Sequence, residues 1–316
     1  MLASPRSVFR WGSVLAGVTA LGVFALGATG PSPRHAAPAP AAADMAGMAG
    51  MDHGAAPTPA AAAAGTGTGA PAMSGMAAGE GLLPELDGYR MDSTVTSLPG
   101  GRAVSYPFTI TGPDGRPLTD FAVAQTKKLH FYAIRSDLTG YQHLHPEMAA
   151  DGGWTADLAA LAPGDWRLYA AFTPGSGPDQ GIEFALSRTV AVTGDAAPPQ
   201  PLPAATGSTT VDGYTVAVQG EPAAAMTQQF TVTISKDGRP VTDLQPYLDS
   251  YAHLSAFREG TEALAHLHPG NPVDGDHGGP TLTFTAMIGE PGNWRVFLQF
   301  RTAGELHTAV LTLHVS

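Results

Sequence analysis

The segment KKLHFYAIR, residues 127–135, alternates between two kinds of side chain with a period of two. In a β-strand this spacing sorts the side chains onto two opposite faces. One face carries Leu129, Phe131 and Ala133, and the other carries His130, Tyr132 and Ile134. Asp-Gly turns and further short alternating runs lie on either side, without a convincing helical pattern. The segment therefore predicts an all-β domain built from short strands.

A second copy of this region lies in the C-terminal half of the chain. DGRPLTD begins at Asp114 and DGRPVTD begins at Asp237, and KKLHFYAIR is matched by YAHLSAFR. PGDWRLYAAF is likewise matched by PGNWRVFLQF, with Trp166 and Trp294 as expected core aromatics. Self-similarity over about 105 residues indicates the duplication of a whole domain. The fold class that follows is all-β, with two tandem β-sandwiches.

Two low-complexity segments separate the parts of the chain. Residues 31–80 consist mostly of Ala, Pro, Gly, Ser, Thr and Met. They predict a disordered spacer, because they offer little apolar surface to bury against the cost of ordering. A Pro-rich stretch over 194–210 predicts a linker. This division leaves residues 81–193 and 211–316 as the two repeats.

The first 30 residues predict export from the cytoplasm. Arg6 and Arg10 precede an uncharged and mostly apolar run over 11–30. Such a run fits either a cleaved signal peptide or a retained membrane anchor of about 20 residues. We therefore expect an extracytoplasmic protein, either secreted or anchored to the outer face of the cytoplasmic membrane.

The composition argues against several classes of function. The net charge is −11 and no basic stripe is present, which argues against a nucleic-acid partner. Cysteine is absent, so disulfides, thiolate metal sites and thiol nucleophiles are excluded. The motifs HExxH and GxSxG and a Gly-rich phosphate loop are also missing. We therefore expect neither enzymatic activity nor an organic cofactor.

Histidines recur at equivalent places in the two copies. His143 and His145 in QHLHPEM lie two residues apart, so they point to the same face of a strand. If this segment forms a hairpin with 127–135 in which opposed residue numbers sum to an odd number, such as 134 with 143, His130 lies on that face as well. The second copy has the same spacing with its own triad: His253, His266 and His268. Each copy is therefore expected to bring three histidines together.

Three neutral imidazoles are suitable ligands for copper, with zinc as the alternative, and a carboxylate or a thioether can complete the shell. Met148 and Glu147 are candidate ligands in the first copy. His307 is a candidate in the second, at a position where the first copy has Phe184. Duplication copies every residue of a domain, however, so a structural or partner-contacting role for the histidines is the alternative. The sequence leaves both interpretations open.

The spacer carries a separate candidate for copper binding. The stretch DMAGMAGMDHG places a methionine at every third position, followed by a histidine. Thioether sulfur is a soft ligand that suits Cu(I). The candidate ligands there are Met45, Met48, Met51 and His53. A low-complexity segment without any ligand is the alternative interpretation.

The hairpin region KKLHFYAIRSDLTGYQHLHP, followed by DGGW and PGDWRLYAAF, resembles the FixH/YtkA-like group of extracytoplasmic immunoglobulin-like modules. This resemblance covers residues 87–193 and 212–316. The spacer is similar to Met-rich stretches of periplasmic copper-resistance proteins. Together these resemblances imply a small extracytoplasmic β-sandwich protein involved in metal homeostasis.

Two functions are therefore in competition. The first is a non-enzymatic metal-binding protein that buffers or delivers copper outside the cytoplasmic membrane. The second is a cell-surface interaction module, in which the histidine face of each sandwich contacts another extracytoplasmic or membrane protein.

Overall fold

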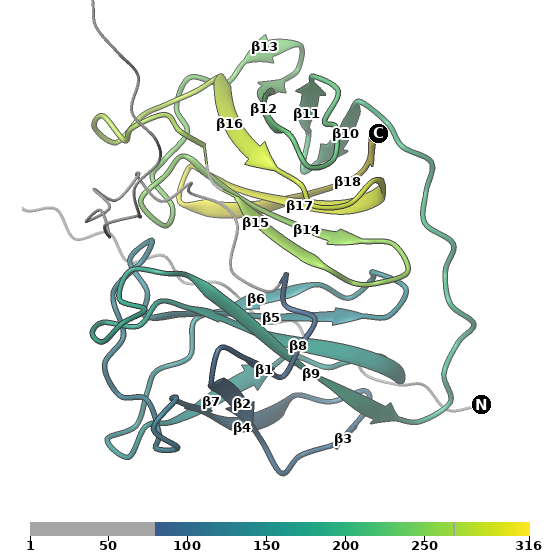
Figure 1. Ribbon diagram of the computed structural model, residues 1–316. Helices are drawn as coiled ribbons and strands as arrows, with labels where there is room; N and C mark the ends of the chain where they lie inside the picture. Colours follow the sequence, from purple (N-terminus) through teal and green to yellow (C-terminus); the bar gives the residue numbers. More distant parts are fainter. Residues whose placement is uncertain (1–79, 268) are drawn as a thin grey trace, which may run out of the picture. The chain divides into compact units, whose positions relative to one another are not determined.

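The computed structural model describes residues 80–267 and 269–316, which form strands and the turns between them (Figure 1). The predicted signal or anchor segment and the Met-rich part of the spacer lie outside the described residues. Within the described ranges, no helix has the length and apolar character needed to cross a membrane. Both repeats belong to one compact unit of the chain.

The first repeat consists of two β-sheets. The strands of the first sheet pair antiparallel, in the order β1 (Glu85–Leu86), β2 (Tyr89–Asp92), β4 (Val104–Thr111) and β7 (Gly153–Leu158). The strand order in the second sheet is β3 (Ser97–Pro99), β9 (Phe184–Thr193), β8 (Gly164–Phe172), β5 (Leu129–Arg135) and β6 (Gln142–Leu144). Its pairs are antiparallel except for the parallel pair β3–β9.

The second repeat has the same plan. Its first sheet contains β10 (Ser208–Val211), β11 (Tyr214–Gln219), β12 (Thr227–Lys236), β13 (Arg239–Pro240) and β16 (Thr281–Met287). Its second sheet has the order β15 (Leu264–Leu267), β14 (Ala252–Arg258), β17 (Gly292–Thr302) and β18 (Glu305–Val315).

The route of the chain between these sheets is that of an immunoglobulin-type sandwich. In the first repeat it passes from β4 to β5 and β6 in the opposite sheet, returns for β7, and ends in β8 and β9. The strand β6 extends the β9–β8–β5 sheet, as an extra strand does in variable-type domains. In the second repeat β12, β14, β15, β16, β17 and β18 follow the same route. The predicted fold class is therefore confirmed.

Each sandwich has its own apolar core between its two sheets. Trp166 is 2% exposed and belongs with Phe131 to the core of the first repeat. Trp294, also 2% exposed, belongs with Phe284 to the core of the second. Large-to-small changes at such positions typically destabilise a domain by about 3–5 kcal/mol. The predicted core role of both tryptophans is confirmed.

The outer face of β5 is buried as well as its inner face, and all seven of its residues are buried. A third apolar cluster joins side chains of both repeats: Tyr132, Ile134, Leu138, Tyr169, Ala171, Ala185, Phe257, Leu264 and Phe297. Polar contacts accompany it, including an ion pair of 2.7 Å between Arg167 and Glu262. The second sheets of the two repeats therefore cover one another's outer faces.

The turn between β5 and β6 depends on a glycine. Gly140 has a φ of +72°, and a Cβ atom there would overlap the Trp166 ring. We expect Gly140→Ala to lower the free energy of unfolding by about 2–4 kcal/mol, because backbone strain adds to overpacking. Gly115→Ala is the matched control: φ is +75° but nothing lies within 4 Å of the added methyl group. It should cost only about 1–2 kcal/mol. Equal losses in urea denaturation would contradict the role of the Trp166 contact.

Candidate metal centre

The β5–β6 hairpin positions the first histidines. Tyr132 pairs with His143, whereas the sequence led us to expect residue 134 opposite 143. A shift of two residues keeps every side chain on its predicted face, since side chains alternate with a period of two. The prediction that opposed residue numbers sum to an odd number is therefore confirmed, although the pair is 132 with 143 instead of the example 134 with 143. The predicted common face of His130 and His143 is confirmed, because their Nδ1 and Nε2 atoms lie 3.1 Å apart.

The β14–β15 hairpin repeats this arrangement in the second copy. Ser255 pairs with His266, and His253 shares the face of Ser255 because it lies two residues away. The ring centroids of His253 and His266 are 4.6 Å apart. The third predicted member of this triad, His268, lies outside the described residues.

The two hairpins bring their histidines into one group, here called the histidine cluster: His130, His143, His145, His253 and His266. Two triads with ligand nitrogens within 4.8 Å of one another overlap in it. One triad is His130, His143 and His145, and the other is His130, His253 and His266. The cluster crosses the boundary between the repeats, since the rings of His143 and His253 are 4.6 Å apart.

The sequence predicted a separate triad in each copy, and the structure differs from this expectation. The face of the sheet that carries the histidines is also the face by which each repeat packs against the other. Histidines from both copies are therefore buried together. His130 and His253 are only 3% and 1% exposed.

The hydrogen bonds of His130 and His143 leave two lone pairs facing each other. His130 Nε2 donates to the backbone oxygen of Ala124 at 3.2 Å. His143 Nδ1 donates to Oε1 of Gln299 at 2.8 Å. In neutral imidazoles the remaining nitrogens, His130 Nδ1 and His143 Nε2, then carry lone pairs. They lie 3.1 Å apart, close to the ~3.3 Å that separates two nitrogens in a tetrahedral shell with ~2.0–2.1 Å metal–nitrogen bonds.

Two further ring nitrogens in the cluster are buried without a hydrogen-bond partner among the described residues. They are Nε2 of His145 and Nδ1 of His253. Leaving a buried polar atom unsatisfied costs about 1–3 kcal/mol. Such atoms call for a specific explanation in a folded protein, and a bound cation is one that suits lone pairs.

Polar side chains around the cluster orient its rings. The Glu183 carboxylate accepts a hydrogen bond of 3.0 Å from His266 Nδ1, and Gln125 Oε1 lies 3.2 Å from Nε2 of the same ring. Carboxylates and amides in these positions set the tautomer and basicity of ligand histidines. The sequence pattern did not indicate these residues or Gln299. One available signal was that Gln299 interrupts an apolar strand at the place where the first copy has Ala171.

A strained turn at residues 124–127 contacts two histidines of the cluster, His130 and His266. Ala124 and Lys127 exchange backbone hydrogen bonds of 2.8 and 3.0 Å around Gln125 and Thr126, whose φ values are +49° and +65°. Non-glycine residues in this left-handed region cost about 1–2 kcal/mol each. Strain of this kind is concentrated at functional sites. Here the turn presents Ala124 to His130 and Gln125 to His266.

Burial favours the neutral form of four histidines of the cluster: His130, His143, His145 and His253. It lowers the pKa of His130 to about 2, with His266 and His145 adding to the shift. It also lowers the pKa of His145 to about 4, together with the positive charge of Lys127. The pKa values of His143 and His253 lie well below the ordinary value for the same main reason. Neutral imidazole is the form that binds metals, so these rings stay competent ligands well below pH 7.

His145 connects the cluster to the surface. It is partly exposed and lines a groove of about 440 Å³ together with Lys127, Met148 and Trp154. Of the five histidines of the cluster, His145 is the one that lines this groove.

The other predicted ligands lie in different surroundings. Met148 packs against the core of the first repeat and lines the groove beside His145. His307 donates from Nδ1 to Asp212 at 2.8 Å, with Thr302 at 3.0 Å from its Nε2. It belongs to neither histidine triad of the described residues. The spacer candidates Met45, Met48, Met51 and His53 lie outside the described residues.

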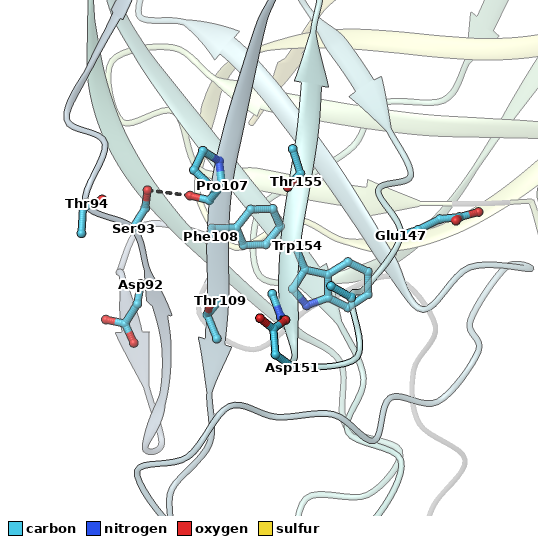
Figure 2. Close-up of a pocket in the computed structure, with 12 residues that line it drawn as sticks. Asp92, Ser93, Thr94, Pro107, Phe108, Thr109, Glu147, Asp151, Trp154 and Thr155 are labelled. Carbon is cyan, nitrogen blue, oxygen red and sulfur yellow. Dashed lines mark hydrogen bonds between the residues drawn. The ribbon is translucent and has the colours of Figure 1, made fainter.

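Figure 2 shows a second groove, of about 560 Å³, on the first sheet of the first repeat. Three carboxylates line it, but two of them already serve the fold. Asp92 accepts hydrogen bonds from Arg90 and Thr111, and Asp151 accepts one from the backbone of Gly153. Among the described residues, none of these carboxylates is buried without a hydrogen-bond partner, in contrast to the ring nitrogens of His145 and His253.

The comparison with known families concerns these two repeats. One family model matches the chain twice, over residues 84–190 and 209–316. The chain belongs to the family described as a domain of unknown function, DUF8832. The histidine cluster thus lies between two DUF8832 domains. The double match confirms the predicted duplication, whereas the resemblances to FixH/YtkA-like modules and copper-resistance proteins stay expectations. No curated protein matches the chain.

Similar solved structures include fibronectin(III)-like modules of Clostridium thermocellum CbhA, with 12% identity over 72% of this chain and 94% of that one, and a TM-score of 0.20. A Salmonella alpha-2-macroglobulin mutant shares 17% identity over 74% of this chain but only 15% of its own, with a TM-score of 0.25. Domains 4 and 5 of the S-layer protein SbsC share 15% identity with this chain, over 72% of this chain and 96% of that one, with a TM-score of 0.21. Similarity at this level supports no assignment of function.

Proposed function

We propose that this protein is a non-enzymatic, extracytoplasmic metal-binding protein that binds an ion through His130, His143 and His145. The observation that carries the proposal is the 3.1 Å approach of His130 Nδ1 to His143 Nε2. Both nitrogens carry lone pairs as long as Ala124 and Gln299 accept the other N–H groups. Two lone pairs at this distance repel each other, and a cation between them turns that repulsion into two bonds.

The donor set selects the class of metal. Neutral imidazole suits copper and zinc, whereas magnesium and calcium require oxygen ligands. No cysteine competes for the ion. Copper is the metal we favour, because the Met/His stretch of the spacer has the soft thioether groups that suit Cu(I), and zinc is the alternative. The apolar N-terminal run supports an extracytoplasmic place for this buffering or delivery.

Two other interpretations fit the structure less well. A separate protein cannot dock onto His130 or His253, because these side chains are 3% and 1% exposed. Asp212, His307 and Thr302 form a chain of hydrogen bonds like that of a nucleophile with its base. Thr302, however, is 2% exposed and thus closed to a substrate. A purely structural role for the cluster is the remaining competitor.

The test is metal binding by the intact, untagged protein and by His145→Ala. We expect one Cu(II) or Zn(II) ion per chain, and an affinity at least tenfold lower in the variant, because a ligand is lost. Metal-free stability should change by less than about 1 kcal/mol, since this ring is partly exposed and its Nε2 has no hydrogen bond to lose. His314→Ala is the matched control, an exposed histidine bonded to Asn293. Intact protein that ignores added metal would establish the structural interpretation.

A further inference from the structure

The second repeat contributes a histidine, His253, to the cluster, in addition to the triad His130, His143 and His145 of the first repeat. His253 is 1% exposed, and its Nδ1 is buried without a hydrogen-bond partner in the described part of the chain. Its ring lies 4.6 Å from that of His143 and 5.7 Å from that of His130, between centroids. With His130 and His266 it forms the second triad. An unsatisfied nitrogen at this place points to a ligand shared by the two repeats.

The first repeat also orients this histidine. Nε2 of His253 lies 3.3 Å from the hydroxyl of Tyr132, which belongs to β5 of the first repeat. A ring whose Nε2 is engaged in this way presents Nδ1 as its other nitrogen, and Nδ1 is the unpartnered atom. The reverse support is present as well, because Gln299 of the second repeat accepts the Nδ1 hydrogen of His143. Each repeat therefore positions a candidate ligand of the other.

We propose that the ion binds at the boundary between the repeats, with His253 of the second repeat as a ligand beside His130 and His143 of the first, so that metal binding and docking of the repeats are coupled. This inference rests on the proposed function and adds to it that neither repeat forms the site alone. The ligand is a late first-row transition ion, copper or zinc, held by nitrogen from both sides.

Coupling follows from thermodynamic linkage. If the docked arrangement holds the ion more tightly than separated repeats do, then the ion must strengthen docking by the same factor. The interface has apolar contacts and the Arg167–Glu262 ion pair of its own, so metal acts on an association that already exists. Release of the ion is then favoured by separation of the repeats.

The first experiment measures the affinity for Cu²⁺ and Zn²⁺, by competition with a chromophoric chelator, in the intact protein and in His253→Gln. We expect a loss on the order of 100-fold in the variant. His314→Gln, on the same repeat but outside the cluster, should leave the affinity unchanged. His253→Leu serves as a second variant, because it keeps buried apolar volume without a nitrogen. Unchanged affinity in both His253 variants would overturn the inference.

The second experiment needs no change in the cluster. A protease site is placed at the exposed linker residues 203–206 of the full chain, and the folded protein is cut there. We expect Zn²⁺ or Cu²⁺ to tighten the association of the two halves at least tenfold, and a chelator to reverse the effect. Metal that binds the cut protein without tightening this association would overturn the inference and leave the proposed function standing. Protein that binds no metal at all would refute the proposed function itself.

Discussion

Replacing His130 with alanine is expected to abolish the stabilisation of this protein by metal. His130 belongs to both triads of the cluster, so its loss leaves neither complete. An ion that binds only the folded state adds about 2.7 kcal/mol to the free energy of unfolding at a hundredfold excess over Kd. If the variant binds a hundredfold more weakly, the same ion concentration adds only about 0.4 kcal/mol. Urea denaturation with and without Zn²⁺ or Cu²⁺ measures both increments.

The matched control for this experiment is His307→Ala. His307 is also buried, at 6% exposure, and has hydrogen bonds to Asp212 and Thr302. Both variants should lose stability without metal, because each removes a buried, hydrogen-bonded ring. Only His130→Ala should lose the additional free energy of unfolding that the metal provides. An increment that survives in His130→Ala would place the ion elsewhere in the protein.

The metal-free protein is expected to lose stability steeply as the pH falls below about 6.5. Burial lowers the pKa of His130 to about 2, and it lowers the pKa of His253 well below the ordinary value. The unfolded chain, with histidine pKa values near 6.5, therefore binds more protons than the folded protein below that pH. The contribution is fully present above pH 6.5 and is lost towards the folded pKa values. Each of these two histidines lowers the free energy of unfolding by about 1.4 kcal/mol for every unit by which the pH falls. The two together lower it by about twice that amount.

Urea denaturation of the metal-free protein at pH 7.5, 6.0 and 5.0 measures this slope. His145→Ala should reduce the slope of stability against pH by the contribution of one titrating group. This reduction applies between pH 6.5 and about 4, because burial lowers the pKa of His145 to about 4. His314→Ala is the control outside the cluster. A stability that is flat between pH 7.5 and 5 would mean that the cluster takes up protons without cost in the folded state, which contradicts its burial.

The fold could be predicted largely from local pattern. The alternation in KKLHFYAIR placed Leu129 and Phe131 in the core, where the structure has them at 1% and 0% exposure. The exact pairing of the β5 and β6 residues could not be predicted from the pattern. The structure pairs His143 with Tyr132 instead of with residue 134. Turn length and turn conformation set register, and Leu138 with a φ of +60° is a turn residue that no pattern announces.

The candidate site could be predicted only in part. His130, His143 and His145 were recognised because their spacing survives a two-residue shift in register. Gln299, which contacts His143, was not recognised, and neither were Gln125 and Glu183, which contact His266. Each lies between 83 and 156 residues from its histidine along the chain. Separation along the chain carries no information about which side chains meet across an interface.

The sequence by itself determined the duplication, the all-β character of each repeat and the common face of His130 and His143. These properties follow from the period of the strand and from identity between the copies, both of which are readable along the chain. Only the tertiary structure decided that the two histidine faces meet, so that His130 is shared between two triads. That outcome depends on the apolar contacts by which Tyr132, Phe257 and Phe297 hold the repeats together. Packing between surfaces depends on their combined shape, which no single strand specifies.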